Sequence, residues 1–359
     1  MDIEEKIKLI AKPPTEEIIT EEDLRNLLET KEHPIAYNGF EPSGMMHLGT
    51  GLISGLKMMD FIKAGVHYKV LLADWHAFLN KKLDGDMKKI KQAAEYFKKG
   101  WAALGVKGVE YIYASDLIEN PDYWEILMKI STKTKFKRIR RCLPIMGRLV
   151  DKYDGLAIAF FLYPLMQCAD IFKLKVDITQ LGLDQRNANM LAREIGPKIG
   201  YWKPIAVHHH LLMGLQKTER MGYDADQAID SQISMKQSKS RPDSAIFIHD
   251  SPKEIKRKLK KAYCPEGQLK ENPIIEIAKY IILRDKDSVL EIKRPAQYGG
   301  DISVTLPELM EQYKTKQIHP GDLKPAVADK ISEILEPVRR YFKDHPEYLD
   351  LFKTTKITR

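Results

Sequence analysis

The feature that most constrains the fold is an alternation, in the first part of the chain, between short apolar runs and stretches of helical periodicity. Buried strands are predicted at residues 34–40, 68–74, 108–113, 176–181 and 205–211. Helices are predicted at residues 20–29, 86–103, 123–141, 154–172 and 184–195, and another opens near Met46. Strands that alternate with helices of this length predict βα units on a mostly parallel sheet. The sequence therefore predicts an α/β fold.

The second part of the chain follows a different pattern. Residues 215–244 are mostly polar and without periodicity, which predicts a long mobile loop of the kind that is usually functional. From residue 251 onward the pattern is mainly helical, at 252–262, 274–283, 306–313 and 322–342. A chain of 359 residues also exceeds the usual size of one hydrophobic core. We therefore expect a separate C-terminal helical module, with a boundary near residue 245.

Composition narrows the class of protein. With 43% hydrophobic and 30% charged residues, the chain is typical of a globular protein. Its net charge of +8 permits a polyanionic partner without requiring one. Cys142, Cys168 and Cys264 form no CxxC pair, so neither a disulfide framework nor a structural zinc site is expected, and a reducing cytosol fits. Residues 155–166, the longest nearly apolar run, are too short to span a bilayer, and we expect neither a membrane anchor nor an export signal.

A first motif, at residues 42–50 (PSGMMHLGT), follows a predicted strand and opens a helix. The N-terminus of a helix presents backbone N–H groups and a partial positive charge, which suit a phosphate chain. His47 adds a donor, and Gly49 has no side chain to keep a nucleotide away from the backbone. The motif taken alone is equally compatible with an ordinary turn and helix start.

A second motif, at residues 236–240 (KQSKS), lies in the predicted loop. Lys236 and Lys239 place two ammonium groups three residues apart, and such charges can stabilise a phosphate whose charge is redistributed during reaction. Alone, the motif is also compatible with a solvated basic loop. The two motifs in this order, separated by one α/β domain, favour a nucleotide-dependent enzyme.

These two motifs, and the chain over nearly its whole length, resemble the archaeal-type tyrosyl-tRNA synthetase family of class I aminoacyl-tRNA synthetases. Residues 42–50 stand where the family has its HIGH signature, and residues 236–240 match KMSKS. Thr50 replaces the second histidine, and Gln237 replaces methionine. The resemblance implies a Rossmann-like catalytic domain at 1–245 with a helical insertion at about 115–160, followed by a helical anticodon-binding domain at 246–359.

The resemblance also implies an activity and its partners. The enzyme would activate L-tyrosine with ATP and transfer the tyrosyl group to the 3′ end of tRNA(Tyr), as a cytoplasmic homodimer. ATP would carry Mg²⁺, with no tightly bound protein metal. The catalytic residues would be His47, Thr50, Lys236 and Lys239, and ATP would contact His47, Gly49 and Lys239.

An unusual polar set lies on the predicted helix at 154–172. Tyr163, Gln167 and Asp170 fall at i, i+4 and i+7, which places them on one face of an otherwise apolar helix. A structural polar network is one interpretation. The resemblance implies instead that this face lines the amino-acid pocket. Its tyrosine-binding residues would be Tyr37 and Asp170 at the phenol, Tyr163, Gln167 and Gln185 at the ammonium and carboxylate groups, and Glu41 and His76 beside them.

Alternatives stay open at several of these positions. An indole N–H could also donate to Asp170, so a tryptophan enzyme of the same class is a rival, although the pair of Tyr37 and Asp170 favours the smaller ring. His76 is equally compatible with a structural role. A non-catalytic RNA-binding paralogue and another nucleotidyltransferase are more distant rivals. Residues 208–210 (HHH) do not predict a metal site, because consecutive strand residues point to opposite faces.

Two segments point to RNA. A basic run ends the predicted helix at 123–141 and comprises Lys133, Lys135, Lys137, Arg138, Arg140 and Arg141. It is compatible with a solvated helix face, but guanidinium groups also suit phosphates and base edges. The resemblance implies that Arg140, Arg141 and Arg186 contact the acceptor stem, that the insertion forms the dimer interface, and that His319 and Asp322 contact the anticodon. By sequence pattern alone, Asp322 is predicted to cap a helix.

Overall fold

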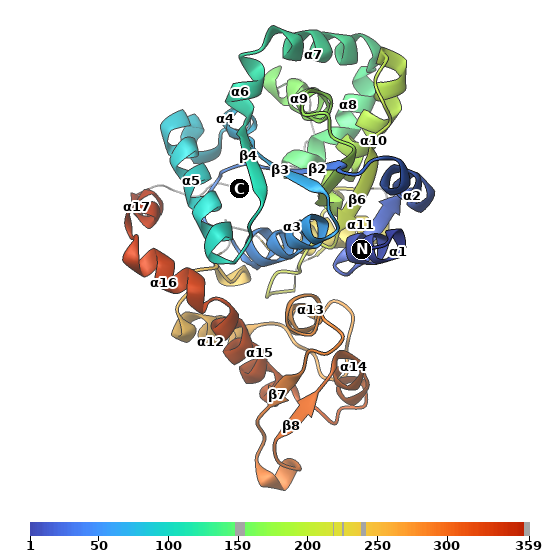
Figure 1. The fold of residues 1–359 in the computed structure, drawn as a ribbon. Coiled ribbons are helices and arrows are strands. Elements are labelled where there is room, and N and C mark those ends of the chain that lie inside the picture. Colours follow the sequence, from blue (N-terminus) through green and yellow to red (C-terminus); the bar gives the residue numbers. More distant parts are fainter. Residues whose placement is uncertain (148–154, 218, 225, 238–241, 355–359) are drawn as a thin grey trace.

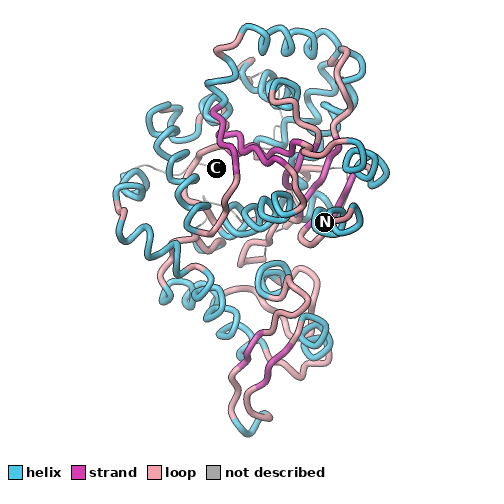
Figure 2. The backbone as a smooth tube through the Cα atoms, in the orientation of Figure 1, coloured by secondary structure: helices cyan, strands magenta, loops and turns pink. Residues whose placement is uncertain are grey.

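A computed structural model describes residues 1–359 except 148–154, 218, 225, 238–241 and 355–359. Among these residues a central sheet is flanked by helices, and a second, smaller group of elements extends from it (Figure 1). Figure 2 shows the strands of the sheet gathered in the middle of the larger part, whereas a two-stranded hairpin lies apart in the smaller part.

The sheet of the described chain has the strand order β1-β6-β5-β2-β3-β4. The strands are β1 (Thr15–Ile19), β2 (Ile35–Phe40), β3 (His67–Leu72), β4 (Val109–Tyr113), β5 (Ile178–Gly182) and β6 (Ile205–His209). All neighbours pair in parallel except β1, which runs antiparallel to β6 along one edge. The parallel α/β fold predicted from the sequence is confirmed, although β1 was not predicted.

Two apolar layers enclose the sheet because successive strand residues point to opposite faces. In β3, Tyr68 and Val70 pack into one cluster with α3 (Ser54–Lys63) and α5 (Met87–Ala103). Leu71 points the other way, into a second cluster with α7 (Pro121–Lys133), α9 (Ala159–Lys173) and α10 (Arg186–Ile195). The first cluster continues into the C-terminal helices, so one face of the sheet shares its core with the smaller part of the chain.

Several predicted helices differ from those observed. The helix expected at 123–141 is two helices, α7 and α8 (Phe136–Cys142), separated by extended residues. The hydroxyl of Thr134 donates to the carbonyl of Ile130 at 2.8 Å and so competes with helix continuation. The residues expected to be one loop, 215–244, contain α11 (Gln227–Met235), which Asp226 caps by accepting from two backbone N–H groups. The helix expected at 154–172 is observed from Ala159 onward. Residue 154, where it was expected to begin, lies outside the described residues.

The N-terminal segment contributes two further helices, α1 (Ile3–Ala11) and α2 (Glu21–Thr30), of which only the second was predicted. Two short helices directly follow strands: α4 (Asp74–Leu79) comes after β3, and α6 (Ala114–Ile118) comes after β4. The helix expected near Met46 begins with a π-helical turn at Gly49–Ile53 that continues directly into α3.

The C-terminal part is mainly helical, as predicted, with one hairpin that was not. Its elements are α12 (Pro252–Lys261), α13 (Pro273–Ile277), β7 (Leu290–Ile292), β8 (Ile302–Val304), α14 (Leu306–Lys314), α15 (Pro320–Ile334), α16 (Glu336–Asp344) and α17 (Glu347–Thr354). The last two helices return to α5 (Figure 1), where Tyr96 packs against Phe342 and Phe352 with ring centroids 5.0 Å apart in each pair. The boundary near residue 245 stays a prediction.

Within the described ranges, no helix combines the length and the apolar character needed to cross a bilayer.

Candidate active site

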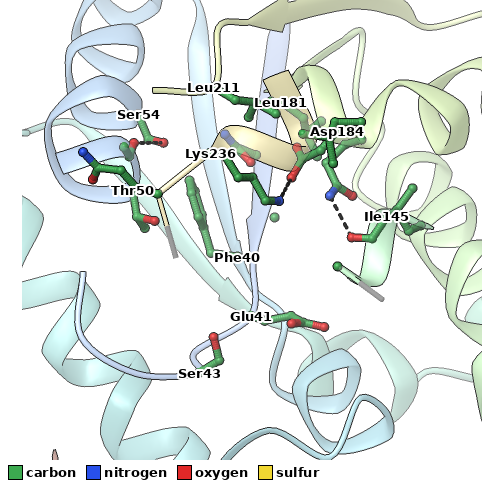
Figure 3. A pocket seen from close by; sticks show the side chains of 18 of the residues that line it. Phe40, Glu41, Ser43, Thr50, Ser54, Ile145, Leu181, Asp184, Leu211 and Lys236 are labelled. Carbon is green, nitrogen blue, oxygen red and sulfur yellow. Dashed lines mark hydrogen bonds and ion pairs between the residues drawn. The ribbon is translucent and has the colours of Figure 1, made fainter. Parts of the chain in front are cut away.

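A cavity of about 310 Å³ opens at the carboxyl ends of β2, β5 and β6. Crevices at this edge of a parallel sheet are where α/β proteins bind ligands. Figure 3 shows Thr50 and Ser54 on one side, Asp184 and Ile145 on the other, and Lys236 between them. The lining includes most residues that the sequence proposed for amino acid and nucleotide: Tyr37, Glu41, His47, Gly49, Thr50, His76, Tyr163, Gln167, Asp170, Gln185 and Lys236.

At its deep end the cavity is lined by buried polar side chains from three elements, α9, α4 and β2. Asp170 of α9 is 1% exposed, and its Oδ1 accepts a hydrogen bond of 2.9 Å from the hydroxyl of Tyr123 on α7. Its Oδ2 lies 3.1 Å from Nε2 of His76 on α4, but the angles there do not form a hydrogen bond. Tyr37 of β2 completes the group, and its hydroxyl is buried without a hydrogen-bond partner among the described residues.

The electrostatics of this deep end follow from burial and from one carboxylate. Burial, reinforced by the charge of Asp170, raises the pKa of Tyr37 well above its ordinary value, so its hydroxyl stays protonated. Burial lowers the pKa of His76, but Asp170, Glu41 and Asp74 together outweigh this effect and the pKa is raised overall. Asp170 Oδ2 and the Tyr37 hydroxyl therefore form an acceptor and a donor that a ligand can satisfy together.

A second polar group surrounds Glu41, which follows β2. Its Oε1 accepts from the hydroxyl of Tyr163 at 2.8 Å and from Nδ2 of Asn80 at 2.9 Å. Nζ of Lys82 lies 3.7 Å from its Oε2. Burial first, and then the charge of Glu41, raises the pKa of Tyr163 well above the ordinary value. The carboxylate thus lines the cavity, with its own partners holding it in place.

Two amides continue this polar wall. Nε2 of Gln167 donates to Oε1 of Gln185 at 3.4 Å. Nε2 of Gln185 donates to the carbonyl of Ile145 at 3.1 Å, the bond that ends at Ile145 in Figure 3. Gln167 is on α9 with Tyr163 and Asp170, so the predicted i, i+4, i+7 face does line one wall of a cavity. The pattern read from the sequence corresponds to a cavity wall and not to a closed structural network.

The first motif forms the outer side of the cavity. The backbone N–H of Thr50 donates to Nδ1 of His47 at 3.3 Å, and the Thr50 hydroxyl lies 3.5 Å from Nε2. A Cβ on Gly49 would lie 3.0 Å from Cε1 of the same ring, so a side chain there would press on His47. The absence of a side chain at Gly49 therefore keeps the imidazole folded against the start of the helix.

The two motifs are joined through backbone hydrogen bonds. Leu48 donates to the carbonyl of Ile246, and Ile248 donates to that of Met46, each at 3.0 Å. The first motif is thus paired with the residues that follow the second. Within the second motif, Gln237 donates to the carbonyl of Leu212 at 3.0 Å. Segments far apart in sequence thus hold the first motif and the first two residues of the second at one cavity.

Lys236 extends into the cavity and pairs with Asp184, whose Oδ2 lies 2.5 Å from its Nζ (Figure 3). Asp184 follows β5 and was not among the predicted site residues, although an acidic residue between a predicted strand and a predicted helix was a usable signal. Lys239, the other lysine predicted to be catalytic and to bind ATP, lies outside the described residues.

The sequence also missed residues that no local pattern marks. Tyr123 reaches Asp170 from another helix, and Asn80 reaches Glu41 from the end of α4. Each contact joins residues 39 to 47 positions apart in sequence. Only the packing of the helices against each other brings such pairs together.

The residues predicted to contact tRNA lie outside the cavity. Arg140 and Arg141 are exposed on α8. Arg186, at the start of α10, forms a bidentate pair with Glu17 of β1, in which its Nε and a terminal nitrogen donate at 2.9 Å. His319 is exposed and caps α15, since its Nδ1 accepts from the N–H of Gly321 at 2.9 Å.

The prediction that Asp322 caps this helix is wrong. The helix begins at Pro320, so Asp322 lies within its first turn, where its own N–H donates to the carbonyl of His319 at 3.0 Å. Proline suits the first helical position because its fixed φ is already helical and its missing N–H is not needed there. This moves the helix start toward the N-terminus and leaves the capping role to His319.

Among the residues that the structure describes, no group of three or more His, Cys, Asp or Glu side chains is arranged to hold a metal ion. The three consecutive histidines are buried, with separate partners: His208 contacts Glu17, His209 contacts Gln180, and His210 contacts Glu16.

Comparison with known proteins places this site in a family. A family model described as tRNA synthetases class I (W and Y) matches residues 29–336. The chain is 44% identical to a tyrosine–tRNA ligase from Pyrococcus furiosus and 42% identical to one from Sulfolobus acidocaldarius, in both cases over the whole of both chains. The crystal structure of a tyrosyl-tRNA synthetase from Pyrococcus horikoshii, complexed with L-tyrosine, superimposes with a TM-score of 0.92 at 42% identity, covering 99% of this chain and 100% of that one.

The chain therefore belongs to the class I tRNA synthetases. A tryptophanyl-tRNA synthetase from Aeropyrum pernix shares only the fold, at 18% identity, a TM-score of 0.66 and coverage of 94% of this chain and 85% of that one. Within the family, the chain is an ATP-dependent enzyme of the tyrosine-specific branch. The resemblance read from the two motifs is confirmed.

Proposed function

We propose that the deep end of the cavity selects tyrosine by its phenol group. The observation that carries this proposal is the pair of unsatisfied buried atoms, the Tyr37 hydroxyl and Asp170 Oδ2. A phenol can donate to the carboxylate and accept from the hydroxyl, so it satisfies both atoms. An indole N–H can only donate and would leave Tyr37 unpaired, and phenylalanine would leave both unpaired. Buried polar atoms without partners are costly, so each of these analogues is disfavoured.

The middle of the cavity suits the ammonium and carboxylate groups of the amino acid. Glu41 and the hydroxyl of Tyr163 supply acceptors for an ammonium group. The amide of Gln167 donates to Gln185 at 3.4 Å and that of Gln185 donates to the carbonyl of Ile145 at 3.1 Å, and both can turn toward the substrate. His76 supports the phenol end through its contact with Asp170. These assignments place the substrate carboxylate on the side of the cavity that His47 lines.

The reaction then proceeds in two displacements without a protein nucleophile. A carboxylate oxygen of tyrosine forms a bond to the α-phosphorus of ATP, the bond to the bridging oxygen breaks, and pyrophosphate leaves. A ribose hydroxyl at the 3′ end of tRNA(Tyr) next attacks the carbonyl carbon, and AMP leaves. Catalysis by this chain consists of positioning and charge stabilisation.

The phosphate-binding residues are assigned from the outer side of the cavity. His47, Thr50 and the backbone at Gly49 bind the phosphate chain at the helix start. Lys236, released from Asp184, and Lys239 stabilise the charge that develops on pyrophosphate. Mg²⁺ enters with ATP and neutralises its phosphates, and no resident protein metal is part of the proposal.

The two parts of the chain divide the contacts with tRNA. We propose that residues 1–245 form the catalytic domain, with an insertion at about 115–160, and that residues 246–359 form the anticodon-binding domain. Arg140 and Arg141 contact the acceptor stem, and Arg186 joins them when its pair with Glu17 opens. His319 and Asp322 contact the anticodon from the start of α15. An exposed basic helix end and an exposed helix N-terminus support these positions.

We propose a homodimer that forms through the insertion. Large apolar side chains on α7, on α8 and before α9 are exposed: Trp124 by 43%, Met128 by 56%, Phe136 by 54% and Ile158 by 76%. Apolar exposure of this extent is typical of an interface. Met128→Asp should shift the mass measured by sedimentation to that of a monomer, whereas a variant that keeps the mass of the native protein would contradict this interface.

A cytoplasmic location follows from the proposed role in translation. The three cysteines, all of them within the described residues, are free. Free thiols agree with a reducing compartment.

The test of the proposed function is ATP–pyrophosphate exchange with each of the twenty amino acids in the presence of Mg²⁺. We expect exchange with tyrosine and much less with phenylalanine or tryptophan. Exchange that prefers tryptophan would overturn the assignment of the phenol pocket. Exchange with no amino acid would overturn the enzymatic role and favour a tRNA-binding paralogue.

A further inference from the structure

A cluster of buried and partly buried charged groups lies at the edge of the cavity, which His210 lines, where three distant parts of the chain meet. His210 directly follows β6, Glu16 belongs to β1, and Glu276 belongs to α13 of the C-terminal part. The side chain of His210 is 8% exposed and that of Glu276 is 17% exposed. None of these residues belongs to the proposed binding or catalytic groups, so their burial requires another explanation.

The geometry of this cluster favours a protonated imidazole. Nδ1 of His210 lies 2.5 Å from Oε1 of Glu16, and Nε2 lies 3.0 Å from Oε2 of Glu276, an ion-pair contact whose angle is outside hydrogen-bond limits. A neutral imidazole has one N–H group, whereas the charged form offers one to each carboxylate. Burial lowers the pKa of His210, but the two carboxylates outweigh burial and raise it to about 9.

Other groups enclose the imidazole from the remaining sides. The ring of Tyr280 stacks on it with centroids 4.5 Å apart and an interplanar angle of 29°. Nζ of Lys279 lies 4.5 Å from the centre of the Tyr280 ring. His209 precedes it in the strand and points to the other face of the sheet, where it contacts Gln180. The imidazole is thus fixed by contacts from β1, α13 and the π-helical turn at Ala278–Ile282.

The same carboxylates contact the chain on either side of Lys236. We call these contact points, Met213 and the end of α11, the base of the lysine segment. Oε2 of Glu276 accepts from the backbone N–H of Met213 at 2.8 Å, and Met213 forms a backbone bridge with Lys236. On the other side, Oε2 of Glu16 accepts from Nε2 of Gln232 on α11, one turn before Lys236, at 2.7 Å. His210 therefore links two carboxylates, one of which holds Met213 and the other of which holds α11, the two segments that flank Lys236.

We infer that His210 is a positioning residue that, through Glu276 and Glu16, sets the position of Lys236 and couples the C-terminal part to the adenylate-forming step. The inference rests on the proposed function for its catalytic readout. Electrostatic stabilisation depends on where a charge lies, and a displacement of about 1 Å can lower a rate by about 100-fold. The binding of tyrosine, at the far end of the cavity, does not depend on this position.

Substitutions at Glu276 test the inference because they separate the charge that faces His210 from the acceptor for the backbone N–H of Met213. Glu276→Gln keeps an acceptor for Met213 but removes the charge, and Glu276→Ala removes both. We expect kcat for pyrophosphate exchange to fall about 3- to 10-fold and about 10- to 100-fold respectively, with the Kd for tyrosine within about twofold. Unchanged exchange, or a parallel loss of tyrosine affinity, would overturn the positioning role.

Asp285→Asn is the matched control. Asp285 pairs with Lys12, so it also joins the C-terminal part to the N-terminal segment, but it makes no contact with the base of the lysine segment. We expect exchange within about twofold of the native rate. A loss equal to that of Glu276→Ala would mean that general loosening between the two parts, and not the position of Lys236, controls the rate.

Hydrogen exchange at the backbone gives a readout that does not depend on activity. The amides of Met213, Gly214 and Gln237 are bonded at the base of the segment. In Glu276→Ala they should exchange at least about tenfold faster while the sheet amides keep their native rates. Native rates at these amides would overturn the inference even for a protein with no synthetase activity. If Glu276→Ala melts at a much lower temperature than the native protein, the exchange rates of the same amides and of the sheet amides are compared in Glu276→Gln instead.

Discussion

The two ends of the cavity are built in different ways. At the phenol end, side chains from several helices and β2 hold one another, and Asp170 and His76 are at most 3% exposed on their side chains. At the phosphate end, backbone hydrogen bonds align two chain segments, and the side chain of Lys236 is 33% exposed. The difference indicates that selection relies on dry, fixed hydrogen-bonding atoms, whereas the chemistry relies on a charge that can change its partner.

The physical reason lies in what each end must do. Rejecting an amino acid that lacks one hydroxyl requires buried polar atoms for which an unmade hydrogen bond is costly. Stabilising pyrophosphate requires a cation to follow charge as it develops, and an ammonium group on a flexible stem is suited to this. The pair of Lys236 and Asp184 illustrates the second case, since the cation already has a partner that a phosphate can replace.

The largest effect is expected at the phosphate end. Lys236→Ala should lower kcat for pyrophosphate exchange by about 100- to 1,000-fold, because a charge near the leaving group is lost, while the Kd for tyrosine changes by less than about threefold. Stopped-flow or exchange kinetics and equilibrium dialysis measure the two quantities. Lys217→Ala, an exposed lysine in the same connection, is the control. Equal losses in rate and tyrosine affinity would remove the distinction between the two ends.

A second variant tests the phenol end. Asp170→Asn should lower kcat/KM for tyrosine by about 10- to 150-fold, because a hydrogen bond to a charged acceptor contributes about 1.5–3 kcal/mol. Activation of phenylalanine should change little, so the ratio of the two values measures the effect. Asp122→Asn, which affects only an exposed ion pair with Lys173, serves as the control. A similar loss for both amino acids would show that Asp170 does not read the phenol.

A smaller effect is expected at Tyr123, which contacts Asp170 and does not line the cavity. Tyr123→Phe removes the hydroxyl that donates to Asp170 but leaves the carboxylate in place. The value of kcat/KM for tyrosine should fall by about 2- to 12-fold, which corresponds to about 0.5–1.5 kcal/mol for one hydrogen bond. Steady-state exchange measures it. A loss greater than that of Asp170→Asn would make Tyr123, and not Asp170, the principal contact of the phenol end.

The smallest effect concerns the scaffold that supports both ends. Glu17 joins β1 to Arg186 and His208, and although burial opposes ionisation, these partners lower its pKa from 4.5 to about 2. Its stabilising effect is therefore present above about pH 4.5 and is lost as the pH falls toward 2.

Glu17→Gln removes this dependence on pH. Between pH 5 and pH 3, the free energy of unfolding of the native protein should fall by about 1–2 kcal/mol more than that of the variant, a value reduced for solvent screening because Glu17 is partly exposed. Denaturant titrations at the two pH values measure the difference. Glu291→Gln, at an exposed position of β7, should behave like the native protein. Parallel slopes for Glu17→Gln and the native protein would contradict the assignment.

Some of the site was predictable because its signals are local. The spacing of Tyr163, Gln167 and Asp170 placed them on one helix face, and they do line one wall. Asp322 shows the limit of such reasoning, because the choice between capping residues depends on where the helix begins. Strand β1 was missed because it pairs along an edge and has a mixed pattern, with Glu16 and Glu17 turned toward buried histidines.

The sequence by itself determined the alternation of the parallel strands with helices, the two motifs and the family, since these depend on periodicity and on residues close together in the chain. Only the tertiary structure decided which atoms lack partners at the phenol end and which carboxylates fix the base of the lysine segment. Tyr123 and Asp170, or Glu276 and Met213, are 47 and 63 positions apart, and no local pattern specifies such contacts. Packing brings them together, and burial then gives each hydrogen bond its energetic weight.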